Sequence, residues 1–155
     1  MNQSPSARAL NLIAGHSARS ADARRAALRL FVPEDGDATV LTPFLLAVAA
    51  DASEDDLVRI EAIRVLPIAY IPQGDPVAAV RAALIRLAAE DFDSDVRNAA
   101  GYTVFDLPGA EDDVARMREL IAAEEDELVA ENIDASLELF LERRKRRGAV
   151  EEPSG

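Results

Sequence analysis

The chain has 155 residues and a net charge of −12. This length is enough for one domain that buries roughly 68–70% of the surface exposed by the unfolded chain. It contains no cysteine, which excludes disulfides and thiolate chemistry, and no tryptophan, so small and branched aliphatic residues must supply the core. The longest apolar run, residues 44–50, is too short to cross a bilayer, and residues 1–20 lack a signal-peptide core, so we expect a cytoplasmic protein with no membrane role.

The first two helices are bounded by capping and helix-breaking residues. A flexible leader over residues 1–4 precedes a helix with Ser4 as N-cap and Pro5 in its first turn. Ser20 caps a second helix, which Pro33 stops. A strongly apolar third helix follows a charged turn.

The later helices carry the same signals. A near capping box that begins at Ser53 starts the fourth helix, and Pro67 should kink or end it. Pro76 suits the first position of the fifth helix, and Asp93 or Ser94 caps the sixth. The eight expected helices cover residues 5–18, 21–32, 39–50, 55–66, 77–90, 95–105, 110–123 and 126–146. They predict one domain over residues 5–147, followed by a disordered tail over residues 148–155.

One pattern recurs in the second helix of each expected pair. Counting from Arg59, core-type apolar residues stand one position before it and three and seven positions after it, which is a single helical face. The same frame fits around Arg24, Arg97 and Ala130, and an acidic residue stands two or three positions before each reference residue. The intervals of 35, 38 and 33 residues are typical of helical repeat proteins.

Two of these stretches, residues 56–62 and 95–100, resemble the HEAT repeat in their order of an acid, Val-Arg and a later Ala. The resemblance implies an all-α fold, an α-solenoid of about four antiparallel helix pairs in which each pair packs only on its neighbours. It also implies a structural ladder of contacts between repeats, made by Asp56, Arg59, Asp95 and Arg97. The match around Arg24 is partial, and the stretch at Ala130 has no arginine.

In HEAT-like proteins the free face of the second helices lines a concave groove that holds partners. Here that face contains the positions two, five and nine residues after each reference residue. Tyr102 beside Arg64 is the best contact candidate because tyrosine and arginine are enriched at interfaces, although Tyr102 could simply cover its neighbours. The candidate partner-binding residues, at or next to these positions, are Arg29, Glu61, Arg64, Asn98, Tyr102, Asp106 and Asn132.

Catalytic and metal-binding patterns are poorly matched. His16 is the only histidine, and Lys145 is the only lysine, which argues against a phosphate loop. Residues 91–95 begin like a calcium loop, but Val96 stands where that loop needs glycine. Acidic clusters near helix starts are explained first by the helix dipole. We therefore expect no enzyme activity, no cofactor and no metal.

The charge distribution suggests what the groove would bind. Residues 34–142 carry 26 acids and seven arginines, whereas the segments on either side are net basic. An acidic middle repels phosphates, so nucleic acid binding is disfavoured, apart from a salt-dependent contact through the run at residues 143–147. The acidic surface either maintains solubility or complements a basic partner.

These features predict a non-enzymatic protein–protein interaction module. Its most specific form is a bacterial inhibitor or immunity-type protein that masks a basic active site on its partner. One alternative is a scaffold or regulatory subunit of a larger assembly, which would co-purify constitutively. Another is a HEAT-like enzyme, either a bilin lyase or a DNA glycosylase, although the acidic middle argues against the glycosylase. The oligomeric state stays open.

Overall fold

The computed structural model describes residues 4–151, which contain eight α-helices, four short 3₁₀ turns and no strand. The 3₁₀ turns follow α1, α4 and α6 and precede α7. The helices are α1 (Ala7–Gly15), α2 (Ala21–Leu30), α3 (Ala38–Ala50), α4 (Asp56–Val65), α5 (Asp75–Glu90), α6 (Ser94–Thr103), α7 (Val114–Ala123) and α8 (Glu127–Glu151). The expected all-α class is confirmed for this part of the chain. Residues 1–3 of the expected leader and 152–155 of the expected tail lie outside it.

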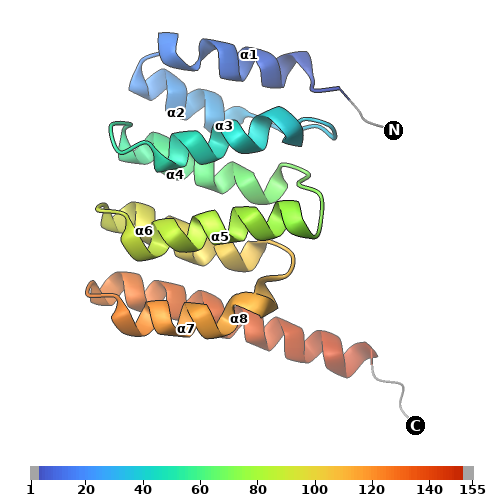
Figure 1. Ribbon diagram of the computed structural model, residues 1–155, viewed down its shortest axis with the longest axis vertical. Helices are drawn as coiled ribbons and strands as arrows, with labels where there is room; N and C mark the ends of the chain where they lie inside the picture. Colours follow the sequence, from blue (N-terminus) through green and yellow to red (C-terminus); the bar gives the residue numbers. More distant parts are fainter. Residues whose placement is uncertain (1–3, 152–155) are drawn as a thin grey trace.

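The helices lie in four consecutive pairs that are stacked along the long axis of the molecule (Figure 1). Helices α1, α3, α5 and α7 form a first row, and α2, α4, α6 and α8 form a second row, with each helix contacting the next in its row. The turns inside the pairs lie at one edge of the stack, and the connections between pairs lie at the other (Figure 1). The free faces of the second-row helices therefore form a continuous surface.

The apolar core lies between the two rows. In α4, α6, α8 and the 3₁₀ turns that follow α4 and α6, the recurring apolar positions are all buried, which confirms the predicted face: Val58, Ala62, Leu66, Val96, Ala100, Val104, Val129, Ile133 and Leu137. Helix α2 departs from this pattern because Ala23 is exposed and Ala27 and Phe31 are half-buried. It contacts only α4 within its row, so one of its sides is uncovered.

Several helix starts are determined by a side chain that accepts backbone N–H groups. Ser20 and Asp93 cap α2 and α6 as predicted. The caps of α1 and α4 are Ser6 and Asp55, each two residues later than expected. The Oγ atom of Ser6 accepts the N–H of Ala9 at 3.1 Å. Ser4, the expected cap, stands two residues earlier and is too far from this N–H group to accept it.

The last helix is longer than predicted. Helix α8 continues through Gly148 to Glu151, beyond the expected end of the helix at residue 146. A single glycine costs only about 1 kcal/mol in a helix, and the residues around it propagate helix well.

Gly101 has a packing role in α6. A Cβ atom at this position would lie 2.7 Å from Cγ1 of Ile133, which is fully buried in α8. The glycine therefore allows α6 and α8 to approach each other more closely than alanine would. This explains why a poor helix former stands inside α6.

Candidate functional site

Three arginines of the second-row helices join each helix pair to the next, and we call them the arginine ladder: Arg24, Arg59 and Arg97. Each one reaches a carboxylate in the turn inside the following pair. The pairs of interacting residues are Arg24–Glu54 at 2.7 Å, Arg59–Asp91 at 2.5 Å and Arg97–Glu124 at 3.1 Å. Each arginine also donates to a backbone carbonyl near the turn of its own pair, at Arg19, Ala49 or Asp91.

The middle arginine is the most deeply buried of the three. The side chain of Arg59 is 1% exposed, compared with 20% for Arg24 and 18% for Arg97. Its Nε–H donates to the Ala49 carbonyl at 2.9 Å, and its two terminal nitrogens bind both oxygens of Asp91. The guanidinium also lies 5.6 Å from the centre of the Phe92 ring. The Nε–H of this cation therefore holds its own pair together, while the terminal nitrogens join that pair to the next.

The acidic residues that sequence reasoning assigned to the ladder take no part in these ion pairs. The true partners, Asp91 and Glu124, belong to the turns rather than to the first turn of each second helix. Asp56 and Asp95 instead lie near Asp93 at the starts of α4 and α6, with carboxylate oxygens within 4.8 Å of one another. Asp93 is already occupied by the N–H groups of its own helix, and carboxylates are favourable at helix N-termini.

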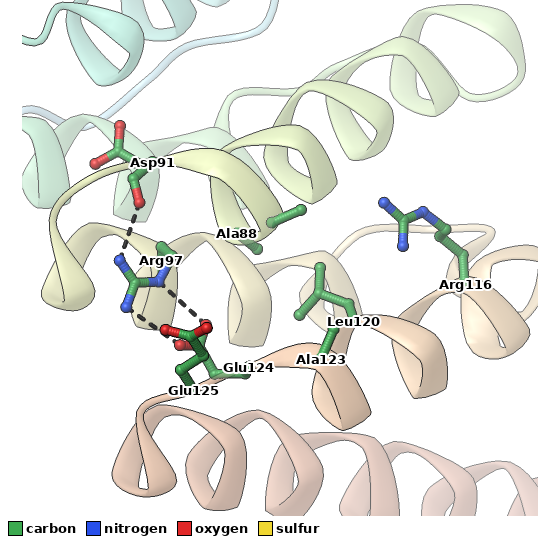
Figure 2. Close-up of a pocket in the computed structure, with 9 residues that line it drawn as sticks. Ala88, Asp91, Arg97, Arg116, Leu120, Ala123, Glu124 and Glu125 are labelled. Atoms are coloured by element: carbon green, nitrogen blue, oxygen red, sulfur yellow. Dashed lines mark hydrogen bonds and ion pairs between the residues drawn. The ribbon is translucent and has the colours of Figure 1, made fainter.

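A cavity of about 380 Å³ lies beside Arg97, between α5 and α7. Figure 2 shows Arg97 between Asp91 and Glu124, with Arg116 on the opposite side of the cavity. Both oxygens of Glu124 accept from Arg97, and this hydrogen bonding raises the pKa of the guanidinium. The third nitrogen donates to carbonyls at residues 91 and 92. The side of the cavity formed by Arg97 and Glu124 is therefore committed to the fold.

His16 lies against the first ion pair of the ladder. Its Nε2 is 3.1 Å from Glu54, and its ring meets Phe44 edge-on. Burial acts to raise the pKa of Glu54, but hydrogen bonds from Arg24, the Asp55 N–H and His16 outweigh it and lower the pKa. The single histidine is thus placed to support a structural carboxylate.

The free face of the second row brings together four of the predicted partner-binding residues. Arg64 of α4 donates to Glu61 at 2.6 Å, and it also reaches the carbonyl of Arg29 at the end of α2. Burial raises the pKa of Tyr102 on α6, and the negative charges of Asp106 and Glu61 raise it further, while Arg64 opposes them. The four side chains therefore lie on the free face of two neighbouring helices, α4 and α6, and of the 3₁₀ turn that follows α6.

Exposed apolar side chains also lie on this free face, although they were not among the candidate residues. Ile68, just after α4, is 49% exposed, and Leu139 of α8 is 58% exposed. Both stand nine positions after their reference residue, as Asp106 does, so the repeat frame had already assigned these positions to the free face. We call the combined surface the α4–α6–α8 band: Glu61, Arg64, Ile68, Tyr102, Asp106 and Leu139.

Three predicted residues lie at its margins or outside it. The Arg29 side chain is exposed, and only its carbonyl contacts the band. Asn98 is half-buried, and its Oδ1 has no hydrogen-bond partner among the described residues. Asn132 is exposed on α8. The structure therefore places Glu61, Arg64, Tyr102 and Asp106 on one face, with Arg29 beside them, whereas Asn98 is half-buried and Asn132 is exposed on the neighbouring helix α8.

No protein-family model, curated protein or solved structure matches this chain. In the part of the chain that the structure describes, no helix combines the length and apolarity needed to cross a membrane.

Proposed function

We propose that the protein is a non-enzymatic interaction module that binds a basic protein partner through the α4–α6–α8 band. One observation carries the proposal: an exposed tyrosine lies between paired and unpaired charges, with exposed aliphatic side chains on both sides. Aromatic and arginine side chains with apolar neighbours are typical of the residues that dominate binding energy at protein interfaces.

The charge of the neighbouring surface supports a basic partner. Between residues 127 and 142, α8 has no basic residue. Its exposed acids in this stretch are Glu127, Glu131, Asp134, Glu138 and Glu142. The negative electrostatic potential of these acids accelerates the approach of a basic protein and disfavours acidic proteins. Salt weakens this effect.

We further propose that the stacked pairs are HEAT-like repeats of an α-solenoid. The support is that Arg24, Arg59 and Arg97 make equivalent contacts from equivalent positions, so neighbouring pairs repeat one another in chemistry as well as in sequence. An experimental structure in which the pairs fail to superimpose, or in which these contacts differ, would contradict this assignment.

In its more specific form, the proposal is that of an inhibitor or immunity-type protein that covers a basic active site. A scaffold role would use the same surface but would leave the partner active. Adding the purified protein to the isolated partner separates the two roles, because only the inhibitor reduces the partner's activity in proportion to its occupancy.

Affinity capture from the source cells tests the binding proposal. The tagged protein is used as bait at low and moderate salt, beside a bait with Arg64→Ala and Tyr102→Ala together. We expect one stoichiometric basic protein, released by salt and absent from the double variant. Arg86→Ala is the matched control, because Arg86 is an exposed first-row arginine of α5 and lies away from the band. Equal capture by all three baits, independent of salt, would contradict the proposal.

A further inference from the structure

We propose that a cavity beside the C-terminal half of α8 binds a small organic phosphate, a function separate from the partner binding proposed above. The cavity has a volume of about 520 Å³. It is bounded by the connection before α5, by the segment that joins α6 to α7, and by α8, which extends past the stack at this edge (Figure 1). Cavities of this size are typical of small-molecule sites.

Three exposed arginines of α8 line this cavity: Arg143, Arg144 and Arg147. Arg143 and Arg147 are one helical turn apart, so they lie on the same face of the helix. Among residues 4–151, none of the three forms an ion pair with a carboxylate, whereas each arginine of the ladder does. The cavity therefore concentrates positive charge that no carboxylate in direct contact neutralises.

The helix dipole does not account for these arginines. Cations are favoured in the last turn of a helix, and the effect of the dipole falls off within that turn. Helix α8 continues to Glu151 and has no basic residue in its last turn. The arginines therefore stand inside the helix, and the feature that they share is the cavity that they line.

Two aromatic rings form the apolar part of the cavity lining. Phe105 is 5% exposed, Phe140 is half-buried, and their ring centroids are 5.4 Å apart. The guanidinium of Arg144 lies 6.0 Å from the centre of the Phe140 ring. Apolar groups beside the arginines exclude water and so strengthen the attraction between a guanidinium and a bound anion. The rings also offer an apolar surface to the carbon skeleton of a ligand.

Phosphate is the anion that this lining fits best. The planar fork of a guanidinium can bind two phosphate oxygens at once, so neighbouring arginines can share one phosphate group. The carboxylates of Asp106 and Glu111 also line the cavity, together with the amide of Gln73. These carboxylates repel further negative charge, which disfavours a polyanion such as nucleic acid, but they can accept hydrogen bonds from hydroxyl groups. The inferred ligand therefore has one phosphate group and a body that carries hydroxyl groups.

Isothermal titration calorimetry of the full chain with ribose 5-phosphate tests this site. We expect a dissociation constant on the order of 0.1–1 mM at low salt, because the arginines are exposed to solvent and water competes for them. Inorganic phosphate reaches the arginines but offers no sugar hydroxyls to the carboxylates, so it should bind about tenfold more weakly. Ribose alone should show no binding at the same concentrations.

Paired substitutions within the basic run separate the cavity from a general attraction to positive charge. Arg143→Gln with Arg147→Gln removes two cations that line the cavity and should weaken ribose 5-phosphate binding at least about tenfold. Lys145→Gln with Arg146→Gln is the matched control, because it removes the same charge from the same run at residues that do not line this cavity. At moderate salt the control should change the affinity by less than about twofold. Circular dichroism checks that both variants fold.

Each outcome decides the inference. Equal losses in the two variants would indicate a general attraction to a basic helix and would overturn the site. It would also be overturned if neither phosphate compound bound, if both bound equally well, or if a single-stranded oligonucleotide of about ten nucleotides bound more tightly than ribose 5-phosphate. The partner-binding variant, Arg64→Ala with Tyr102→Ala, should leave ribose 5-phosphate binding unchanged. Either proposal can therefore fail without the other.

Discussion

Arg59 provides a sharp test of how the helix pairs are held together. Its side chain is 1% exposed, and its partner Asp91 is 7% exposed. Arg59→Met keeps much of the side-chain volume but removes the charge and the bonds to Ala49 and Asp91. Removing one member of a buried ion pair costs about 3–5 kcal/mol, because the other charge stays buried and unpaired. Domains of this size are stabilised by about 5–15 kcal/mol, so the loss should be large.

Urea unfolding followed by circular dichroism measures this loss as a free energy of unfolding. The equivalent change Arg97→Met should cost less, about 1–2 kcal/mol, because Arg97 retains contact with water. Arg86→Met, at an exposed arginine of α5, should change stability by less than about 0.5 kcal/mol.

A second substitution isolates the role of charge. Asp91→Asn removes the negative charge but can still accept the N–H of Asp93, so Arg59→Met with Asp91→Asn should be more stable than Arg59→Met alone. If Arg59→Met unfolds like the Arg86→Met control, or if the second change destabilises it further, the buried-charge reasoning is refuted.

Three further predictions concern single side chains. Gly101→Ala should destabilise by about 1–2 kcal/mol, because the clash with Ile133 exceeds the gain in helix propensity, and Ile133→Ala in the same chain should reduce that penalty in a double-mutant cycle. Asp106→Asn should stabilise by about 0.3–1 kcal/mol at neutral pH. Because the pKa of Asp106 is raised, its favourable contribution is fully present below the ordinary value of 3.8 and is lost as the pH rises through the raised pKa, so the gain from Asp106→Asn should vanish in acid. Glu54 has a lowered pKa, so its contribution is present above 4.5 and is lost as the pH falls. Glu54→Gln should therefore flatten the acid side of the stability profile, and an unchanged slope would show that the Arg24 contact is not the cause.

The helices were predictable because their signals are local. Ser20, Asp93 and Pro67 act on neighbouring backbone groups, and α2, α4 and α6 begin or end where those residues require. The two-residue errors at Ser6 and Asp55 arose where several capping residues stood close together in the sequence. Tertiary contacts determine which of several neighbouring capping residues becomes the N-cap.

The partners of the ladder arginines were not predictable from the frame used, because each pair joins residues about thirty positions apart. A usable signal nevertheless exists. Glu54, Asp91 and Glu124 stand five or six positions before the reference residues Arg59, Arg97 and Ala130, so the acid of each turn recurs with the same period as the arginines. Assigning each of these acids to the ladder arginine of the preceding helix pair would have given the observed ion pairs.

The candidate site was partly accessible for the same reason. The repeat frame placed Arg64, Tyr102 and Asp106 on one face, because that face depends only on helical periodicity. It did not reveal that Asp106 lacks a donor while Glu61 has one, since this depends on which side chains reach across from α4. It also gave no reason for Gly101, whose explanation lies in the neighbouring helix.

The junction between the second and third helix pairs differs mechanically from the other two. At the edge where the pairs are connected, Ser6 and Asp37 tie the first pair to the second, and Arg81 and Asp113 tie the third to the fourth. Among residues 4–151, the middle junction has no such polar tie at that edge, and Arg59 fastens it only at the opposite one. If the stack bends, we therefore expect it to open at this junction before the other two. Such an opening would separate the C-terminal ends of α4 and α6 and would change the width of the band.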